Sequence, residues 1–119
     1  MTKTVQVDPQ TLRQAIEGGD VALYKSLYAE DAEVYIVDRA SPPSRPRVLH
    51  NPGEIAAYLD DVCGRAMRHR LEQIVHSGDR IAFLEACQYP GGQQVLCSAM
   101  LELEGGKIKR QTSVQAWDE

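Results

Sequence analysis

Glu85 is the residue whose place in the sequence best suits proton transfer. It belongs to residues 81–89, in which large apolar side chains alternate with smaller ones as in a half-buried strand. One face of this strand carries Ile81, Phe83, Glu85, Cys87 and Tyr89. Burial among such groups favours the neutral form of a carboxyl, and a carboxyl that changes protonation can act as a general acid or base. The alternative is that Glu85 pairs with an arginine or lies at an exposed edge.

Asp38 and His69 are the other candidates for catalysis. Asp38 directly follows the predicted strand at residues 33–37, where it is either a base or a turn residue that ends the strand. His69 lies at the start of a later strand and is flanked by Arg68 and Arg70. This basic neighbourhood also fits an exposed, solvated histidine, so both interpretations of His69 stay open.

The histidines and cysteines form no metal-binding motif. They are His50, His69, His76, Cys63, Cys87 and Cys97. No two histidines have the H-x-x-x-H spacing and no two cysteines the C-x-x-C spacing, so we predict no metal ion and no cofactor. The mostly apolar neighbours of the cysteines favour reduced core residues over a thiolate nucleophile. A Cys87–Cys97 bridge across a hairpin is the less favoured alternative.

The composition is that of a single globular domain spanning residues 1–119. Apolar residues make up 43% of the chain and charged residues 25%, which supports a hydrophobic core without disulfides. The net charge of −4 argues against a nucleic-acid partner. Residues 1–8 lack the apolar run of a signal peptide, and no stretch of about 18 apolar residues could span a membrane. We therefore expect a cytoplasmic protein whose partner is a small molecule or a protein.

Three helices are predicted in the first half of the chain. Asp8 and Pro9 start the first helix, Asp20 caps a short second helix, and Asn51 with Pro52 starts the third. The third helix has an apolar stripe at helical spacing, which suits packing on a sheet. This stripe consists of Ile55, Tyr58, Leu59, Val62 and Met67.

The second half of the chain is typical of an antiparallel meander. Turn residues, such as Gly78 and Gly105, recur at intervals of roughly a dozen residues between alternating apolar segments. The predicted strands are residues 71–76, 81–89, 95–103 and 108–117. Together with the helices, these strands predict an α+β fold in which helices cover one side of an antiparallel sheet.

Several segments resemble the nuclear-transport-factor-2-like superfamily, in its SnoaL-like and ketosteroid-isomerase-like branch. Residues 15–20 and 27–34 resemble the opening of such domains, and residues 51–55 resemble the start of their third helix. Residues 78–83 and 101–108 resemble their hairpin signatures. The resemblance implies a cone-shaped fold, in which a curved antiparallel sheet wraps around about three helices of the N-terminal half. It also implies a pocket inside the cone and a homodimer formed through the outer sheet face.

The resemblance locates the catalytic groups of the known enzymes, and this chain lacks them. Ketosteroid isomerases use an Asp base, with a Tyr and a protonated carboxylic acid as the oxyanion hole. The Tyr position falls on Leu12, and the acid position, which SnoaL-like cyclases also use, falls on Ala99. The base position falls at or near Ile36, two residues before Asp38. The Arg–Asp pair of limonene-epoxide-hydrolase-like members has no counterpart on residues 95–103.

The resemblance also directs the face of Glu85 and the polar face of the last strand toward the pocket. That strand alternates Gln111, Ser113, Gln115 and Trp117 with Thr112, Val114 and Ala116. The usual rule for half-buried strands predicts the reverse, with the polar face in water. Inward glutamines would orient a polar ligand by hydrogen bonds. The expected pocket residues are Tyr24, Tyr35, Tyr58, Phe83, Cys87, Ala99, Gln111, Ser113, Gln115 and Trp117, beside the catalytic candidates Glu85, Asp38 and His69.

Three functions fit these observations. The first is a cofactor-independent SnoaL-like cyclase, isomerase or dehydratase, which acts by acid–base catalysis on a hydrophobic or polycyclic small molecule. The second is a small-molecule-binding protein without turnover, which the missing family acids favour. The third is a dimeric interaction module with a vestigial pocket. A carboxylate that titrates in the pocket distinguishes the first function from the others, and a defined cavity of roughly some hundreds of Å³ distinguishes the second from the third.

Overall fold

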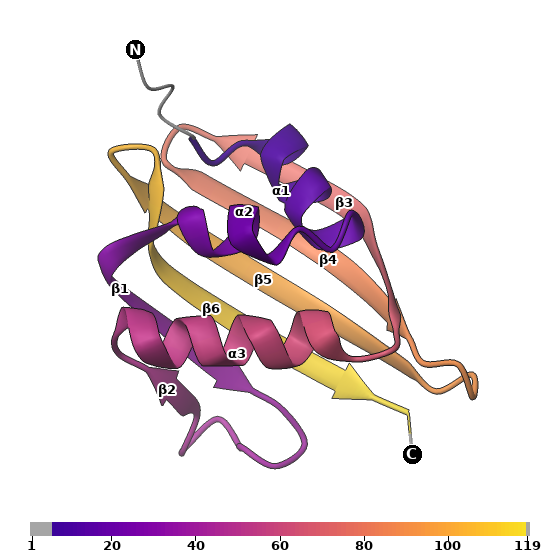
Figure 1. Cartoon of the computed structure of the whole chain (residues 1–119). Coiled ribbons are helices and arrows are strands. Elements are labelled where there is room, and N and C mark those ends of the chain that lie inside the picture. The colour runs from indigo at the N-terminus through magenta and orange to yellow at the C-terminus, as the bar shows by residue number, and fades with distance from the viewer. Residues whose placement is uncertain (1–5, 119) are drawn as a thin grey trace.

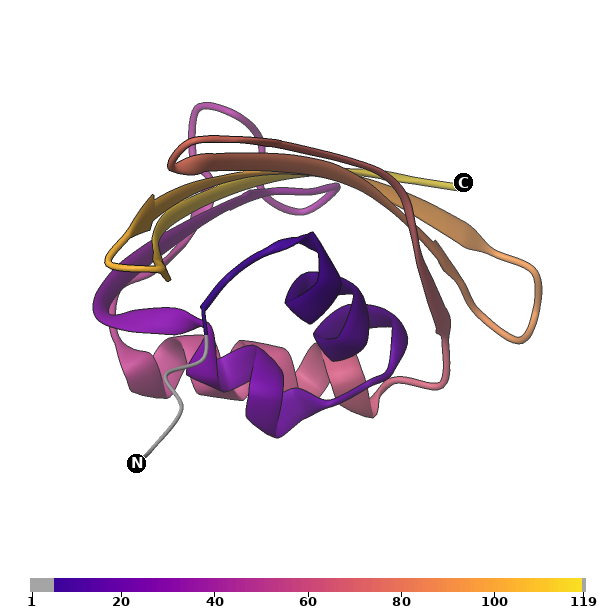
Figure 2. The ribbon, with the colours of Figure 1, turned by 90° about the horizontal axis from the view of Figure 1, so that it is seen from above.

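Three helices lie against the concave side of a curved six-stranded sheet in the computed structural model, which describes residues 6–118 (Figures 1 and 2). The helices are α1 (Pro9–Glu17), α2 (Val21–Ser26) and α3 (Pro52–Gly64). The strands are β1 (Tyr28–Val37), β2 (Arg47–Leu49), β3 (Arg68–Ser77), β4 (Arg80–Gln88), β5 (Gln94–Glu104) and β6 (Lys107–Trp117). The predicted α+β cone is confirmed. Among the described residues, no helix has the length and apolar character needed to cross a membrane.

The helices begin at the residues that the sequence predicts. The Asp8 carboxylate accepts a hydrogen bond from the Thr11 backbone N–H at 2.8 Å, and the Thr11 hydroxyl accepts one from the Asp8 backbone N–H at 3.0 Å. The side chains of Asp20 and Asn51 likewise accept hydrogen bonds from the backbone N–H groups of Leu23 and Glu54 at the starts of α2 and α3. These side chains bind N–H groups that have no partner inside the helix, which fixes where each helix starts.

The cap of α1 makes the stability of the protein depend on pH. The backbone N–H of Thr11, followed by its hydroxyl, lowers the pKa of Asp8. A lowered folded-state pKa stabilises the fold above the unfolded-state pKa, and this contribution is lost as the pH falls through the folded-state value. Asp8→Ala should therefore lower the free energy of unfolding by about 1 kcal/mol at neutral pH, and by less at acidic pH.

Urea unfolding of wild type and Asp8→Ala at neutral and acidic pH measures this dependence. Asp8→Asn is the matched control, because asparagine caps helices about as well as aspartate but carries no charge. It should keep most of the stability and lose the pH-dependent part. A difference between wild type and Asp8→Ala that stays constant with pH would contradict the prediction.

The strands are arranged in the order β2-β1-β6-β5-β4-β3. Strands β3 to β6 form the predicted antiparallel meander. The sequence pattern does not predict two pairings. The first is the antiparallel pair of β1 with the three-residue strand β2, and the second is the parallel pair of β1 with β6. Three residues are too few to show alternation, and the parallel pair joins Tyr28 to Ile108, 80 residues later in the chain.

One predicted helix position is wrong. The apolar stripe predicts Met67 on the third helix, but α3 ends at Gly64. Arg65 already has extended backbone, with φ −76° and ψ 144°. Ile55 and Leu59 are the buried residues of α3, and Tyr58 and Val62 are half-buried. Met67 instead lines the cavity described below, from the connection between α3 and β3.

The core is divided into two hydrophobic clusters. The first lies between α1 and the middle strands, and consists of Val7, Leu12, Ala15, Ile16, Leu27, Leu71, Ile81, Phe83, Ala99, Leu101 and Ile108. The second lies between α3 and β1, and consists of Ala32, Val34, Ile36, Leu49, Ile55 and Leu59. Both clusters lie on the helix-covered side of the sheet, which curves around them (Figure 2).

Among residues 6–118 no helix covers the outer face of the sheet (Figure 2), and this face is partly apolar. Its exposed large apolar residues are Val75, Leu96, Met100 and Val114, with exposed fractions of 64%, 47%, 56% and 50%. They come from β3, β5 and β6, and Met100 is paired with Thr112 on the neighbouring strand. These four residues are called the outer apolar face below.

Candidate functional site

A cavity opens between α3 and the concave face of the sheet. Its volume is about 100 Å³, which is room for several waters or a small ligand group. Its walls include all but one of the side chains that the sequence predicted for the site. These are Tyr24, Asp38, Tyr58, His69, Phe83, Glu85, Cys87, Ala99, Gln111, Ser113, Gln115 and Trp117.

Tyr35 is the predicted pocket residue that does not line this cavity. It alternates along β1 with Val34 and Ile36, which are both buried in the core, so its side chain lies on the opposite face of the sheet. Its hydroxyl donates to Glu33 at 3.0 Å, and the guanidinium of Arg110 lies 4.7 Å from the centre of its ring. Tyr35 therefore belongs to the outer surface.

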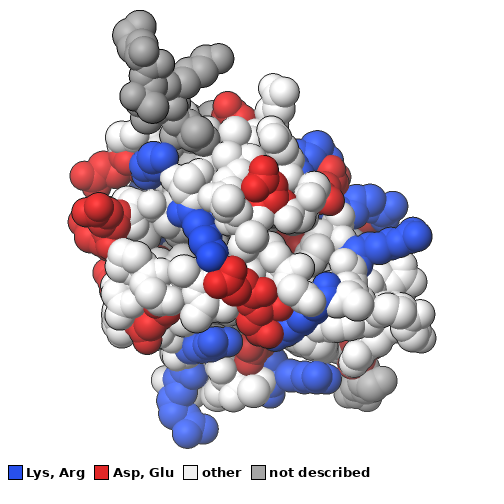
Figure 3. Space-filling model, in the orientation of Figure 1, with Lys and Arg blue, Asp and Glu red and all other residues white. Residues whose placement is uncertain are grey.

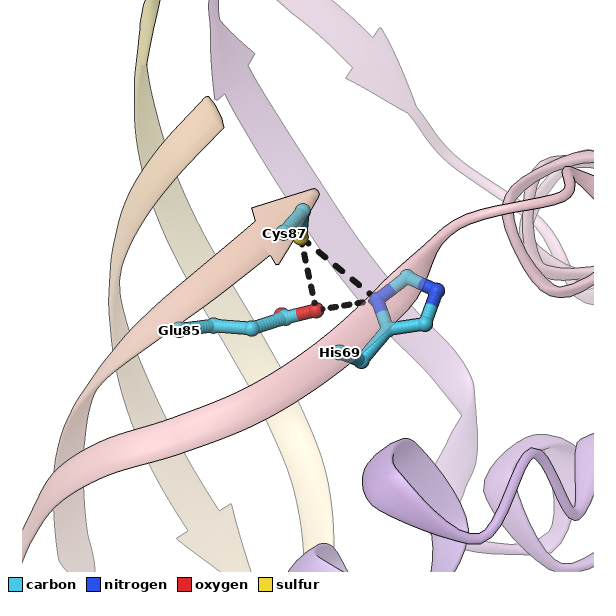
Figure 4. Close-up of side chains that lie close together, drawn as sticks. All are labelled: His69, Glu85 and Cys87. Carbon is cyan, nitrogen blue, oxygen red and sulfur yellow. Dashed lines mark hydrogen bonds and ion pairs between the residues drawn. The ribbon is translucent and has the colours of Figure 1, made fainter. Parts of the chain in front are cut away.

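His69, Glu85 and Cys87 meet at one point on the cavity wall (Figure 4). The Glu85 Oε2 atom lies 2.7 Å from His69 Nδ1 and 3.2 Å from Cys87 Sγ, and this sulfur lies 3.5 Å from the same nitrogen. The side chains of His69 and Glu85 are each only 11% exposed. Glu85 thus pairs with a histidine inside the cavity, and neither with an arginine nor with bulk water.

A β-bulge between Leu71 and Gln73 determines the direction of His69. If the register on the hairpin side of the bulge continued, His69 would lie opposite Gln88, whose side chain is exposed. The bulge shifts the pairing by one residue, so that His69 lies opposite Cys87 instead. This shift brings the imidazole to the inner face, where it lines the cavity.

The hydrogen bond between Glu85 and His69 makes this pair able to transfer protons. A carboxyl and an imidazole that share a hydrogen bond can each hold the proton, so the pair can both accept and return one. The thiol of Cys87 donates to Glu85, and burial followed by the charge of Glu85 raises the pKa of Cys87. Burial likewise raises the pKa of Cys97 to about 12. The thiols of Cys87 and Cys97 are therefore neutral near pH 7, a state unsuited to nucleophilic catalysis.

The polar face of β6 points into the cavity. Gln111 and Ser113 are buried, whereas Val114 on the other face is 50% exposed, which is the reverse of the usual rule for half-buried strands. The side-chain carbonyl of Gln111 accepts from the Tyr28 hydroxyl at 2.5 Å, and its amide N–H donates to Ser113 Oγ at 2.9 Å. These bonds satisfy the buried amide and fix its orientation.

Tyr58 contributes a hydroxyl that can donate a hydrogen bond into the cavity. Its oxygen accepts a hydrogen bond from the Gln115 amide at 3.4 Å, and Gln115 in turn accepts from the Trp117 indole at 3.0 Å. Burial raises the pKa of Tyr58, so the hydroxyl stays protonated near pH 7. Its O–H can therefore donate to a ligand oxygen.

Asp38 lies at the mouth of the cavity rather than in the cluster. Its carboxylate accepts from the Ala40 backbone N–H at 2.9 Å, and its backbone pairs with that of Ser41. These contacts are those of a turn residue, which is the alternative that the sequence left open. The mouth also contains Trp117 and Arg65, which line the same surface hollow as Asp38.

Arg65 and Tyr89 are parts of the mouth that are missing from the predicted pocket residues, and of these two Tyr89 lies on the predicted inward face of residues 81–89. Arg65 pairs with Asp61 at 2.6 Å and donates to the Tyr89 hydroxyl at 3.2 Å, while the rings of Tyr89 and Trp117 stack with centres 6.2 Å apart. The spacing of Asp61 and Arg65 by four residues on a helix was a signal for their pairing. The mouth therefore combines a flat aromatic surface with a basic group.

The curved sheet, the three helices and the internal cavity together define an NTF2-like α+β fold. The chain belongs to the SnoaL-like domain family, which matches residues 10–111. No curated protein matches the chain.

Three solved structures illustrate the fold. An NTF2-like protein of unknown function from Mesorhizobium loti is 15% identical, covers 96% of this chain and 99% of its own, and has a TM-score of 0.75. A second one, from Burkholderia xenovorans, is 18% identical with coverages of 92% and 81% and a TM-score of 0.70. A Kribbella flavida protein, only provisionally described as a ketosteroid isomerase, is 14% identical with coverages of 92% and 76% and a TM-score of 0.73. These similarities show the fold alone.

The structure shows what replaces the acids that the family resemblance leads one to expect. Leu12 and Ile36 are each 1% exposed and belong to the hydrophobic core. Ala99 lines the cavity but offers no polar group. It lies opposite Phe83 on β4, and Glu85 follows two residues later on the same face. The buried carboxyl of this cavity is thus supplied by β4 instead of β5.

Proposed function

We propose that this protein is a cofactor-independent enzyme that transfers protons on a hydrophobic or polycyclic small molecule, as a cyclase, isomerase or dehydratase of the SnoaL-like type. The observation that carries the proposal is the 2.7 Å hydrogen bond between the Glu85 carboxyl and the His69 imidazole inside the cavity. Apolar walls, including Phe83 and Val95, suit a hydrophobic ligand. The stacked rings at the mouth suit a flat one.

The proposed chemistry begins with a proton on carbon next to a carbonyl group. Glu85 takes this proton, and the electron pair of the C–H bond moves onto the carbonyl oxygen as an enolate. Tyr58 stabilises the enolate oxygen by donating a hydrogen bond. His69 holds the Glu85 carboxyl in place and shares the proton that the carboxyl has taken up. In an isomerisation this proton is returned to another carbon, and in a dehydration it is given to the leaving hydroxide.

The second candidate function is ligand binding without turnover. It is favoured by the absence of the tyrosine, acid and base that the resemblance implies, since Leu12, Ala99 and Ile36 stand at or near those positions. The polar groups on the cavity wall, such as Glu85 and Gln111, support either of these functions over an interaction module with a vestigial pocket.

Hydrogen–deuterium exchange distinguishes these functions. The protein is incubated in D₂O with a panel of hydrophobic mono- and polycyclic ketones, and deuterium at carbon is measured by mass spectrometry. Faster exchange than in buffer, lost in Glu85→Gln, supports the enzyme. A ketone that raises the melting temperature but exchanges at the buffer rate supports binding alone. If no ketone does either, the proposed substrate class is wrong.

We also propose that the outer apolar face joins two copies of the chain. Its uncovered residues, such as Met100 and Val114, are at least half exposed, and such apolar surfaces mark interaction sites. Lysine at position 114 would place a charge on each side of a symmetric interface. Val114→Lys should raise the dimer dissociation constant at least about 30-fold, since losing a central contact costs about 2 kcal/mol or more.

Analytical ultracentrifugation of the wild type and of Val114→Lys tests this assembly. Gln14→Lys, on the exposed side of α1, adds the same charge away from the face and should leave the dimer intact. A monomeric wild type at tens of micromolar, or a Val114→Lys variant as dimeric as the wild type, would overturn the proposal.

The proposal also includes a cellular location and a class of partner. The three cysteines are free, which is the state expected in the reducing cytoplasm. Acidic and basic side chains are interspersed on the face shown in Figure 3, and the net charge is −4. Both observations support a cytoplasmic enzyme that acts on a small molecule instead of nucleic acid.

A further inference from the structure

Three side chains of different chemistry converge on one point of the cavity wall (Figure 4). His69 contributes a ring nitrogen, Glu85 a carboxylate oxygen and Cys87 a sulfur, and these atoms form a triangle with sides of 2.7, 3.2 and 3.5 Å. In proton-relay sites the groups form a chain in which the thiol and the carboxylate bind opposite nitrogens of the imidazole. Here both lie on the same nitrogen, Nδ1. The three groups therefore form a cluster and not a proton relay, and all three line the cavity.

The three ligand atoms can form one face of a tetrahedral metal site. Ligand bonds of about 2.0 Å to nitrogen and oxygen and about 2.3 Å to sulfur place nitrogen and sulfur about 3.5 Å apart in a tetrahedron. The observed separation of His69 Nδ1 and Cys87 Sγ is 3.5 Å. Nitrogen and oxygen would be about 3.3 Å apart, so the Glu85 carboxylate has to move outward by roughly 0.6 Å. A small rotation of one side chain achieves this.

We propose that His69, Glu85 and Cys87 bind a single divalent transition-metal ion of the zinc type, with the fourth ligand position facing the cavity. A mixed nitrogen, oxygen and sulfur set suits an ion of borderline softness such as Zn²⁺. It does not suit Mg²⁺ or Ca²⁺, which prefer oxygen ligands only. Binding forms a metal–sulfur bond to Cys87, and the thiol proton is released to solvent.

The backbone holds two of the three ligands in place. His69 and Cys87 lie directly opposite each other on β3 and β4, and Glu85 projects from the same face of β4. Ligands on paired strands need little reorganisation to bind an ion. His69 and Cys87 also line a second, more open hollow beside Gly18 and Gly19, so an ion can reach them without passing through the main mouth.

This inference is independent of the proposed enzymatic function. It predicts direct binding of an ion to the protein, whatever the substrate. The ion would bind the carboxylate oxygen of Glu85 that accepts the substrate proton in the proposed reaction. If both proposals hold, Zn²⁺ should therefore inhibit turnover, and a chelator should restore it.

Cobalt binding to the reduced, chelator-treated full-length protein tests the inference. Co²⁺ should bind with 1:1 stoichiometry and give the near-ultraviolet absorption of a thiolate–cobalt bond together with the strong visible bands of tetrahedral cobalt. Zn²⁺ should displace Co²⁺, and Mg²⁺ should not. Cys87→Ser and His69→Gln should each weaken binding by about 100-fold or more, since even outer-shell changes cost about 10–100-fold.

Matched controls separate this site from other thiols and imidazoles. Cys97→Ser changes a cysteine of the same cavity, and His76→Gln changes an exposed histidine of the same strand as His69. Both should bind Co²⁺ as the wild type does. Circular dichroism shows that each variant is folded, and Zn²⁺ protection of Cys87 from alkylation, read by mass spectrometry, tests the site without substitution. No thiolate–cobalt absorption in the wild type, or unchanged absorption in Cys87→Ser, would overturn the inference.

Discussion

Glu85→Gln should lower the rate of proton exchange on a bound substrate by about 100- to 10,000-fold, the range that a positioned general base contributes. Glutamine has nearly the same shape and can still hydrogen-bond His69, which lies 2.7 Å from the carboxylate. It cannot take up a proton, because its amide is neutral and is not a base near pH 7. The loss should therefore appear in kcat, while KM changes little.

Steady-state kinetics with a ketone identified by deuterium exchange measures this effect. Glu104→Gln makes the same chemical change at an exposed position of β5 and should leave kcat as in the wild type. His69→Gln should also lower kcat, because the carboxyl loses the imidazole that holds it and shares its proton. A Glu85→Gln variant that retains wild-type kcat would remove Glu85 from the mechanism.

Leu12→Ala should destabilise the protein by about 2–5 kcal/mol, the usual cost of removing a buried leucine side chain. Leu12 is 1% exposed and lies in the first hydrophobic cluster, where α1 packs against the sheet. Alanine favours helix formation at least as well as leucine, so the loss comes from the cavity left in the core. Urea unfolding should show a lower midpoint with an unchanged slope.

Gln14→Ala provides the matched control on the same helix. Gln14 is exposed, and its replacement should change the free energy of unfolding by no more than about 0.5 kcal/mol. A loss of less than about 1 kcal/mol in Leu12→Ala would show that α1 contributes little to the core. The expected result would establish that Leu12 serves to pack α1 against the core.

Local sequence signals were sufficient to predict most of the fold. Helix starts depend on capping side chains such as Asp8 and Asn51, which act on residues only three positions away. The meander strands are separated by glycines in the left-handed conformation, such as Gly78 with φ 57° and Gly105 with φ 61°. These features are visible in the sequence because the residues that cause them are neighbours.

The site was only partly predictable, because its geometry depends on pairing between distant segments. Alternation along 81–89 placed Glu85 and Cys87 on one face, which the structure also shows. His69 could not be placed in this way, because a single bulge after Leu71 reverses the alternation of β3. For the same reason, a search for metal ligands at fixed spacings within one segment could not identify a cluster formed across two strands.

The parallel pairing of β1 with β6 also has a consequence for how the protein is made. β6 lies between β1 and β5, yet of the six described strands it is the last to be synthesised. Until β6 pairs with it, β1 has an open edge. The β3–β5 hairpins can form early because their contacts are local, whereas closing a loop of this length is slow. Completion of the sheet should therefore be the late step of folding, and chains stalled before β6 should be prone to aggregation.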